Sequence, residues 1–342
     1  MRLRTVLATL TAALAAATCA GAGPAAAGTH AGRDHACSPA VSLDRFSDAL
    51  DKTTYQGIYT GNLSALAVDR DGSLAALSDR SALFRLDRGT LRPKGVVPLA
   101  DASGAPLDSE GLAVDRDGTR LVTSETEPSV RRYSRDGRVL GSLPVPPALR
   151  VAPAGRAGAN QTFEGLTLLP GGRTLLASME YALAGDTPGI VRFQTWRRGG
   201  DGHFRPAAQY AYRTDDGLDV PEVQATPDGR LLVLERGFTA GVGNTVRLYL
   251  ADLRHATDTR DTGTLTGQPG VRLIRKTLLT DIASCPSLGA TARQPQPNPL
   301  LDNIEGMTVT GRAGGRLKVL LVSDDNENPA QTTRFYYLRI RV

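Results

Sequence analysis

The sequence predicts an all-β fold made of repeated hairpins, and three observations lead to this prediction. Short runs of apolar and β-branched residues recur along the chain, and many are followed by Asp-Gly or Gly-Gly. Gly and Pro contribute 37 and 21 of the 342 residues, enough to end many short elements. The segment Leu-Ala-Val-Asp-Arg-Asp-Gly occurs twice, at residues 66–72 and 112–118. Apolar runs joined by such turns are typical of antiparallel strands in tight hairpins.

The internal repeat predicts how these hairpins are organised. Similar units begin at residues 66–72, 112–118, 163–172, 221–229 and 303–309. In each unit an apolar run ending in Ser or an acid follows, and then a third run of alternating residues. A unit of about 40 to 60 residues with about four strands is typical of a propeller blade. We therefore predict a β-propeller with five blades of four antiparallel strands. Six blades are the alternative, because residues 258–299 have room for further strands.

The two ends of the repeat predict how the ring of blades closes. The last unit has three runs and reaches Val342, so that its outer strand is missing. A strand-like segment, Thr54 to Tyr59, stands before the first unit, and we expect this N-terminal strand to complete the last blade. The propeller domain is accordingly predicted at residues 53–342, preceded by an N-terminal segment at residues 28–52.

Residues 1–27 have the features of a secretory signal peptide. Arg2 and Arg4 precede an apolar run, Val6 to Ala17, that is too short to span a bilayer, and small residues follow it. No later segment is long and apolar enough to cross a membrane. Removing this peptide changes the formal charge from +5 to (40 − 2) − 35 = +3, with both signs spread along the chain. We expect a secreted, extracellular monomer that binds neither nucleic acid nor membrane.

Two cysteines, Cys37 and Cys285, remain in the predicted mature chain. An even pair in an exported protein is most simply one disulfide, which would tie the amino terminus to a late loop. Several other chemistries lack their residues. No Gly-x-Ser-x-Gly nucleophile turn occurs, and none of the 4 histidines stands in a His-Glu-x-x-His zinc motif.

Acidic residues recur at two matching positions of the units. In a propeller, the start of the first strand and the end of the second emerge at the same mouth of the central channel. The sequence pairs Glu110 with Glu125 and Glu164 with Glu180 at these positions. The other pairs are Glu222 with Glu235, Glu305 with Asp324 and Asp325, and Ser64 with Asp79. The unit of Glu222 is one residue shorter before its turn, so that this side chain can face differently. We expect a ring of about nine acids around one mouth.

Such a ring predicts a metal site. Crowded carboxylates raise one another's pKa unless a cation compensates them, and oxygen ligands at flexible spacing suit calcium best. The candidate calcium ligands are Glu110, Glu164, Glu222, Glu305 and Asp324. The alternative interpretation is that these acids accept hydrogen bonds from backbone donors and hold neighbouring blades together. Arg80 and Arg236 directly follow ring acids, and we expect them to neutralise their neighbours rather than to contact phosphate.

Several motifs also resemble a known family. They are the repeated Glu-Gly-Leu or Glu-Gly-Met before a strand, Leu231 to Arg236, Asp302 to Met307, and Leu321 to Asn326 followed by Gln331-Thr. These resemble the secreted phytase-like family, named for "esterase-like activity of phytase", over residues 43–342. The resemblance implies a β-propeller and suggests calcium-assisted hydrolysis of phosphomonoesters or other esters.

Two classes of function are consistent with these residues. The first is a metal-dependent phosphoesterase acting on a small anionic or ester substrate, with Asp325 or Glu180 as the base that activates water. The second is a non-catalytic propeller that binds or scaffolds a partner, with acids that are structural or bind cations. Acids that only lock blades should recur in every unit, yet the first unit has Ser64 and the last has Asp-Asp-Asn. This asymmetry favours a site.

Overall fold

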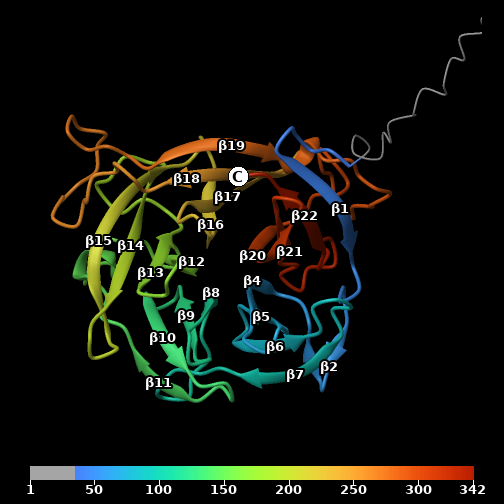
Figure 1. Ribbon diagram of the computed structural model, residues 1–342, viewed down its shortest axis with the longest axis horizontal. Coiled ribbons are helices and arrows are strands. Elements are labelled where there is room, and N and C mark those ends of the chain that lie inside the picture. Colours follow the sequence, from blue (N-terminus) through green and yellow to red (C-terminus); the bar gives the residue numbers. More distant parts are fainter. Residues whose placement is uncertain (1–34) are drawn as a thin grey trace, which may run out of the picture. The chain divides into compact units, whose positions relative to one another are not determined.

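The computed structural model describes residues 35–342, whose strands form five antiparallel sheets of four strands around a central axis (Figure 1). The predicted all-β propeller with five blades is therefore confirmed. The predicted signal peptide lies outside the described residues. In the described part of the chain, helical structure is restricted to two single turns, Pro147–Leu149 and Ile282–Ser284. No helix there is long and apolar enough to cross a membrane.

Four consecutive strands build each of the first four blades, and the first strand of each lies innermost. The first blade contains β4 (Leu63–Val68), β5 (Leu74–Ser78), β6 (Ala82–Leu86) and β7 (Pro93–Pro98). The second contains β8 (Ser109–Val114), β9 (Arg120–Ser124), β10 (Ser129–Tyr133) and β11 (Val139–Ser142). The third contains β12 (Phe163–Leu168), β13 (Thr174–Met179), β14 (Ile190–Arg198) and β15 (Phe204–Arg213). The fourth contains β16 (Asp219–Ala225), β17 (Leu231–Thr239), β18 (Gly243–Asp252) and β19 (Arg275–Asp281).

The fifth blade joins the two ends of the described chain. It contains β20 (Ile304–Ala313), β21 (Arg316–Ser323), β22 (Phe335–Ile340) and, as its outer strand, β1 (Val41–Ser47). The pairs Val41↔Ile340 and Leu43↔Leu338 align β1 with β22. An N-terminal strand thus closes the ring, as predicted.

The segment that closes the ring is not the one predicted. Residues Thr54 to Tyr59 form a separate two-stranded hairpin, β2 (Thr54–Tyr55) and β3 (Ile58–Tyr59). Gln56 and Gly57 both have positive φ, of 52° and 80°, as the tight turn of such a hairpin requires. In β1, by contrast, Val41 and Leu43 alternate with more exposed residues and are fully buried. Burial of this apolar face against the fifth blade decides which segment becomes the outer strand.

The six-blade alternative fails because the residues between β18 and β20 add β19 and loops but no further sheet. Arg192 anchors one of these loops. Its guanidinium pairs with Asp186, with Nε 2.7 Å from Oδ2, and also donates to the carbonyl oxygens of Thr262 and Gly263. The loop is thus held against the third blade by a buried ion pair with satisfied donors.

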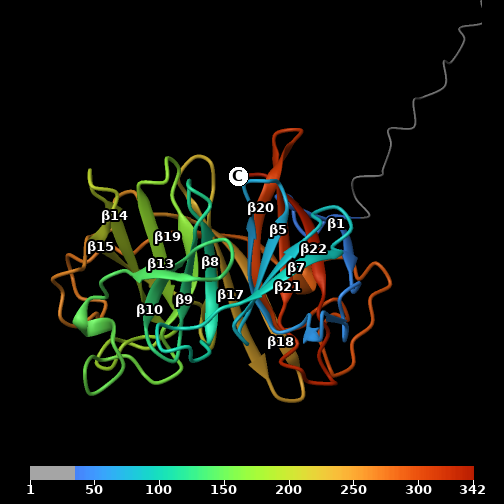
Figure 2. The ribbon, with the colours of Figure 1, turned by 90° about the horizontal axis from the view of Figure 1, so that it is seen from below.

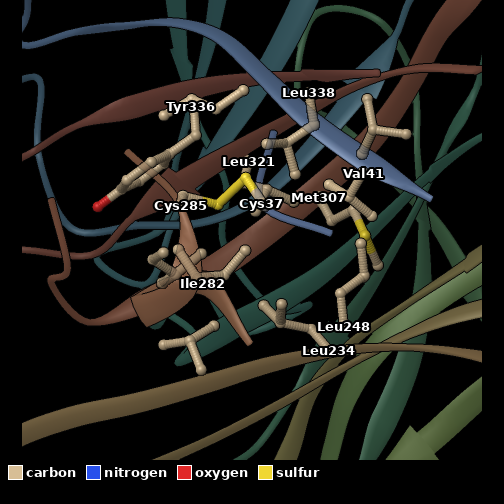
Figure 3. Packing of buried hydrophobic residues seen from close by; sticks show 14 of the residues in the cluster. Cys37, Val41, Leu234, Leu248, Ile282, Cys285, Met307, Leu321, Tyr336 and Leu338 are labelled. Atoms are coloured by element: carbon tan, nitrogen blue, oxygen red, sulfur yellow. A yellow bond between two sulfur atoms is a disulfide. The ribbon is translucent and has the colours of Figure 1, made fainter. Parts of the chain in front are cut away.

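The predicted disulfide between Cys37 and Cys285 is present. It links the residues before β1 to the loop after the helical turn Ile282–Ser284, and so fastens the closing strand of the ring. Figure 3 shows the two cysteines within a cluster of buried apolar side chains from the fourth and fifth blades, among them Leu248, Met307 and Leu338. Cross-linking residues 248 positions apart removes freedom mainly from the unfolded chain.

Candidate functional site

The repeated Glu-Gly pair places an acid at the start of three inner strands. A Cβ on Gly111 would lie 2.3 Å from the Glu164 carbonyl oxygen, and one on Gly165 would lie 2.4 Å from the Val223 nitrogen. Glycine therefore lets neighbouring inner strands approach closely. In the fifth blade Gly306 takes this position, and each of the three strands has a register shift there. Such β-bulges redirect side chains, which here are the glutamates that precede the glycines.

The structure brings Glu110, Glu164 and Glu305 together at one mouth of the channel, with acids from the ends of the second strands. We call the acid ring the carboxylates that interact with one another there: Asp79, Asp108, Glu110, Glu125, Glu164, Glu180, Asp219, Glu305 and Asp324. Two overlapping groups within it have carboxylate oxygens within 4.8 Å of one another. They are Asp108, Glu110 and Glu125, and Glu125, Glu164 and Glu180.

Burial and mutual repulsion make these carboxyls hard to ionise. Loss of solvent raises the pKa of Glu305 and of Asp79 to about 7, and neighbouring acids add to the shift. The pKa of Glu180 rises to about 9 through burial and the charge of Asp219. Burial also raises the pKa of Glu110 and Glu164 well above the ordinary value, with further contributions from Glu305 and Glu110 respectively. At neutral pH the ring thus holds protons unless a cation replaces them.

Arg236 supplies positive charge inside the acid ring. Its Nη1 lies 2.7 Å from Glu305 Oε1, its Nη2 lies 3.4 Å from Glu180 Oε1, and its Nε lies 3.7 Å from Asp219 Oδ1. Nη1 also donates to the side-chain oxygen of Asn303. Burial by itself lowers the pKa of this guanidinium, but Glu305 and the other acids outweigh it and raise the pKa. Arg236 therefore neutralises its neighbours, as the sequence predicted.

The donor set of the ring suits a hard divalent cation. Every potential ligand in the two groups is a carboxylate oxygen, the type that calcium and magnesium prefer. Asp79 Oδ1 and Asp219 Oδ1 are buried without a hydrogen-bond partner, and so is Ser64 Oγ on the neighbouring inner strand. Buried polar atoms without partners are costly, and a cation bound elsewhere in the ring would offset the charge of these two carboxylates. The ring therefore fits the calcium ion that the sequence analysis proposed.

A family profile described as "Phytase-like: Esterase-like activity of phytase" matches residues 58–327. The matched range contains all the acids of the ring. The chain belongs to the phytase-like family. No match was found among curated proteins.

Solved propellers resemble this phytase-like domain with low similarity. A gluconolactonase from Xanthomonas campestris is 16% identical, with 82% of this chain and 73% of that chain covered and a TM-score of 0.42. The PQQ-bound aldose sugar dehydrogenase from Streptomyces coelicolor is 14% identical, with 90% and 99% covered and a TM-score of 0.42. The glutaminyl cyclase from Myxococcus xanthus is 13% identical, with 88% and 97% covered and a TM-score of 0.43. No functional argument follows from such low scores.

Glu222 lies outside the acid ring of the phytase-like domain. It is almost fully buried, and its Oε1 accepts hydrogen bonds from the backbone nitrogens of Val223, at 2.8 Å, and Leu166, at 3.2 Å. Burial raises its pKa, and no neighbouring charge contributes. In register it stands opposite Leu234, as Leu112 stands opposite Val122 in the second blade. The glutamate thus occupies the position of a packed leucine and links two inner strands.

Glu235 also lies outside the ring, because it stands two residues earlier in register than the other acids. Arg236 pairs with Asp219 at the position where Met179 pairs with Phe163, so that Gly237 rather than Glu235 corresponds to Glu180. Glu235 instead takes the position of Ser178, inside the strand, where both side chains are fully buried. Glu235 there accepts hydrogen bonds from Tyr212 Oη and Lys276 Nζ, both at 2.6 Å.

The two predicted bases have different surroundings. Glu180 lies in the acid ring, where it hydrogen-bonds to Glu125. Asp325 is fully buried beside the ring, and it accepts hydrogen bonds from Lys52, Tyr59 and the backbone nitrogen of Asn62. Burial alone would raise its pKa, but Lys52 and Tyr59 outweigh this effect and lower it. Its contacts favour a structural role that holds the β2–β3 hairpin to the fifth blade.

Two acids of the ring were missed by the sequence analysis. Asp108 stands two residues before Glu110 and directly before β8, so that its closeness to the Glu-Gly pair was a usable signal. Asp219 begins β16, and the fourth unit has Val220 where the second, third and fifth units have their first glutamate. No motif marks Asp219, which joins the ring through Arg236 and Tyr181.

Proposed function

We propose that the protein is a secreted, metal-assisted hydrolase that cleaves a phosphomonoester or a related anionic ester at the acid ring. One observation carries this proposal. Two groups of three carboxylates share Glu125, and within each group one oxygen of every residue lies within 4.8 Å of the other two. Arg236 is the cation that pairs with Glu180, Asp219 and Glu305 in this ring, and it leaves most ring acids uncompensated. Membership of the phytase-like family supports hydrolysis as the activity.

Different residues of the ring would have different roles in hydrolysis. Glu125 would hold the divalent cation together with Glu110, from one of its two groups, and Glu164, from the other, and Glu305 and Asp324 complete the ring. When bound, the cation neutralises the charge of an anionic ester and lowers the pKa of a water molecule. Glu180 is the candidate base, because the raised pKa of its carboxyl makes the ionised form more basic than an ordinary carboxylate. Arg236 keeps Glu305 and Glu180 in place through its two terminal nitrogens.

The first experiment measures release of phosphate from phytate and from an aryl phosphate by the mature protein. An aryl acetate is tested in parallel, and each substrate is used with calcium and with excess chelator. The proposal predicts hydrolysis that requires calcium and stops in chelator. Full activity in chelator, or no turnover of any ester with calcium bound, would contradict it.

A matched pair of variants separates a role in catalysis from a role in folding. Glu125→Gln removes a carboxylate common to both candidate ligand groups, whereas Glu222→Gln changes an equally buried glutamate outside the ring. We expect Glu125→Gln to lower kcat/KM at least a hundredfold and Glu222→Gln to leave it within a factor of three. Calcium titration by calorimetry should show weaker binding only for Glu125→Gln.

A non-catalytic binding propeller is the second candidate function. It is favoured by one contact, since Glu125 Oε1 also accepts a hydrogen bond from the Thr162 backbone nitrogen at 3.3 Å and thereby links two blades. This function predicts that calcium raises the melting temperature while no ester is hydrolysed.

A further inference from the structure

The β17–β18 hairpin extends past the acid ring. Strands β5, β9, β13 and β21 end directly before the ring acids Asp79, Glu125, Glu180 and Asp324. Strand β17, by contrast, continues past Arg236 to Thr239 before the chain turns. Figure 2 shows this hairpin projecting from one face of the propeller, at its lower edge. A longer hairpin at this mouth places additional side chains beside the ring.

Phe238 is the largest apolar side chain on this extension. Pairing of β17 with β18 continues without a register shift from Arg236 to Thr239. Alternate residues of a strand share a face, so that Phe238 lies on the face of Arg236, about 7 Å farther along the strand. The side chain is nevertheless 60% exposed. An exposed phenylalanine next to a charged site is a candidate contact for an apolar ligand group.

Tyr181 provides a second aromatic ring at the same mouth. It directly follows Glu180, and its hydroxyl donates to Asp219 Oδ2 at 3.0 Å. Asp219 in turn is the cross-strand partner of Arg236. Tyr181 remains 40% exposed, even though its hydroxyl is held by a ring acid. Tyr181 thus contacts Asp219 from the third blade, and Phe238 stands two residues after Arg236, the cross-strand partner of Asp219, on the fourth blade.

We propose that Tyr181 and Phe238 form a subsite for the alcohol part of the substrate, and that this alcohol is aromatic or similarly flat and apolar. The inference rests on the proposed function, because it assigns the anionic part of the ester to the acid ring and its cation. A polyol carrying many phosphates would instead place charged groups against the two aromatic rings, which costs desolvation energy. The subsite therefore selects aryl esters over highly charged esters.

The test compares ligands that differ only in the apolar group. Binding of phenylphosphonate and methylphosphonate, neither of which can be hydrolysed as an ester, is measured on the calcium-loaded protein. Turnover of phenyl phosphate and glycerol phosphate is measured in parallel. We expect phenylphosphonate to bind about tenfold more tightly than methylphosphonate, and Phe238→Ala to remove most of this difference. Leu140→Ala, at a 42% exposed residue of outer strand β11, is the matched control and should change nothing.

The outcomes separate this inference from the proposed function. A rise in KM for phenyl phosphate in Phe238→Ala, with kinetics on glycerol phosphate unchanged, supports both. If no ester is hydrolysed but phenylphosphonate binds through Phe238, the proposed function fails and the aromatic subsite remains. Equal affinities for the two phosphonates, no binding of either, or a Phe238→Ala variant that binds phenylphosphonate like the unchanged protein would overturn the inference.

Discussion

The third and fourth blades carry glutamates at nearly the same places in their sequence repeats, yet they use them differently. In the third blade, Glu164 and Glu180 both enter the acid ring. In the fourth blade, Glu222 accepts backbone hydrogen bonds between inner strands, and Glu235 pairs with Lys276. The fourth blade instead supplies Asp219 and Arg236 to the ring.

This difference teaches that register, rather than residue type, decides which acids meet. Glu235 stands two residues before the position of Glu180, and Gly237 occupies that position. A Cβ on Gly237 would lie 2.6 Å from the Gly217 carbonyl oxygen, so that no larger residue fits without a shift. The fourth blade can therefore place no acid there. The long side chain of Arg236 reaches into the ring instead, and it supplies positive charge beside the position where the other blades have an acid.

The largest expected effect is the pH dependence of stability in the metal-free protein. It arises mainly from the acids of the ring. Folding raises the pKa of Glu305 from an ordinary value of 4.5 to about 7, and that of Glu180 to about 9. The folded state then binds more protons than the unfolded state, so that stability falls as pH rises between about 5 and 9. We expect a loss of several kcal/mol, measured by urea unfolding in chelator. Calcium should flatten this slope, and a stability that rises with pH would contradict the mutual repulsion of the ring acids.

Glu235→Ala should produce the next largest effect. The change removes the acceptor of Tyr212 Oη and one of the two carboxylate partners of Lys276 Nζ, and we expect a loss of about 3 kcal/mol in the free energy of unfolding. Because Glu235 lies outside the ring, calcium affinity should stay within a factor of two. Calorimetric titration of the folded variant checks this, and a large loss of calcium binding would place Glu235 in the site after all.

Arg236→Met should destabilise the metal-free protein at pH 8 by about 2 kcal/mol, because the ring acids lose their buried counter-charge. The loss should shrink at pH 5.5, where more of the acids hold protons. Calcium should bind more tightly to this variant, since a positive charge has been removed from the ring. Arg80→Met is the control: the Arg80 side chain is 65% exposed, and its loss should change stability by less than about 0.5 kcal/mol. Equal effects of the two variants would show that Arg236 has no special role.

The smallest effect on stability is expected for Glu164→Gln in chelator, at less than about 0.5 kcal/mol at pH 7, because burial raises the pKa of this carboxyl and so favours its neutral form, which the glutamine amide resembles. The same variant should weaken calcium binding at least tenfold. Glu222→Gln, in the corresponding strand of the fourth blade, should leave calcium binding unchanged. Similar calcium affinities in the two variants would remove the distinction between the blades.

Much of the fold could be predicted from the sequence, because a propeller repeats its local pattern. Repeated apolar runs and Asp-Gly turns lead to five blades, and the even pair of cysteines leads to the disulfide. The closing strand was assigned wrongly, since Thr54 to Tyr59 and Val41 to Ser47 both have strand-like composition. Contact between β1 and β22 at the opposite end of the described chain decides between them, and such a contact leaves no local signal.

The residues of the candidate site, like the fold, could be predicted only in part from the sequence. Glu110, Glu164 and Glu305 were found from the sequence because the Glu-Gly pair is a local requirement of a bulged inner strand. The absence of Glu222 and Glu235 from the ring depends on cross-strand register, and the inclusion of Asp219 depends on contacts with Arg236 and Tyr181.

The sequence by itself determined the repeated blades, the disulfide partners and the acids that precede the bulge glycines, because each depends on residues close in the chain or on a pair with one possible partner. Only the tertiary structure decided which strand closes the ring, which acids share the mouth of the channel and which cation compensates them. These features depend on the register between strands and on distances between side chains of different blades, which no local pattern in the sequence encodes.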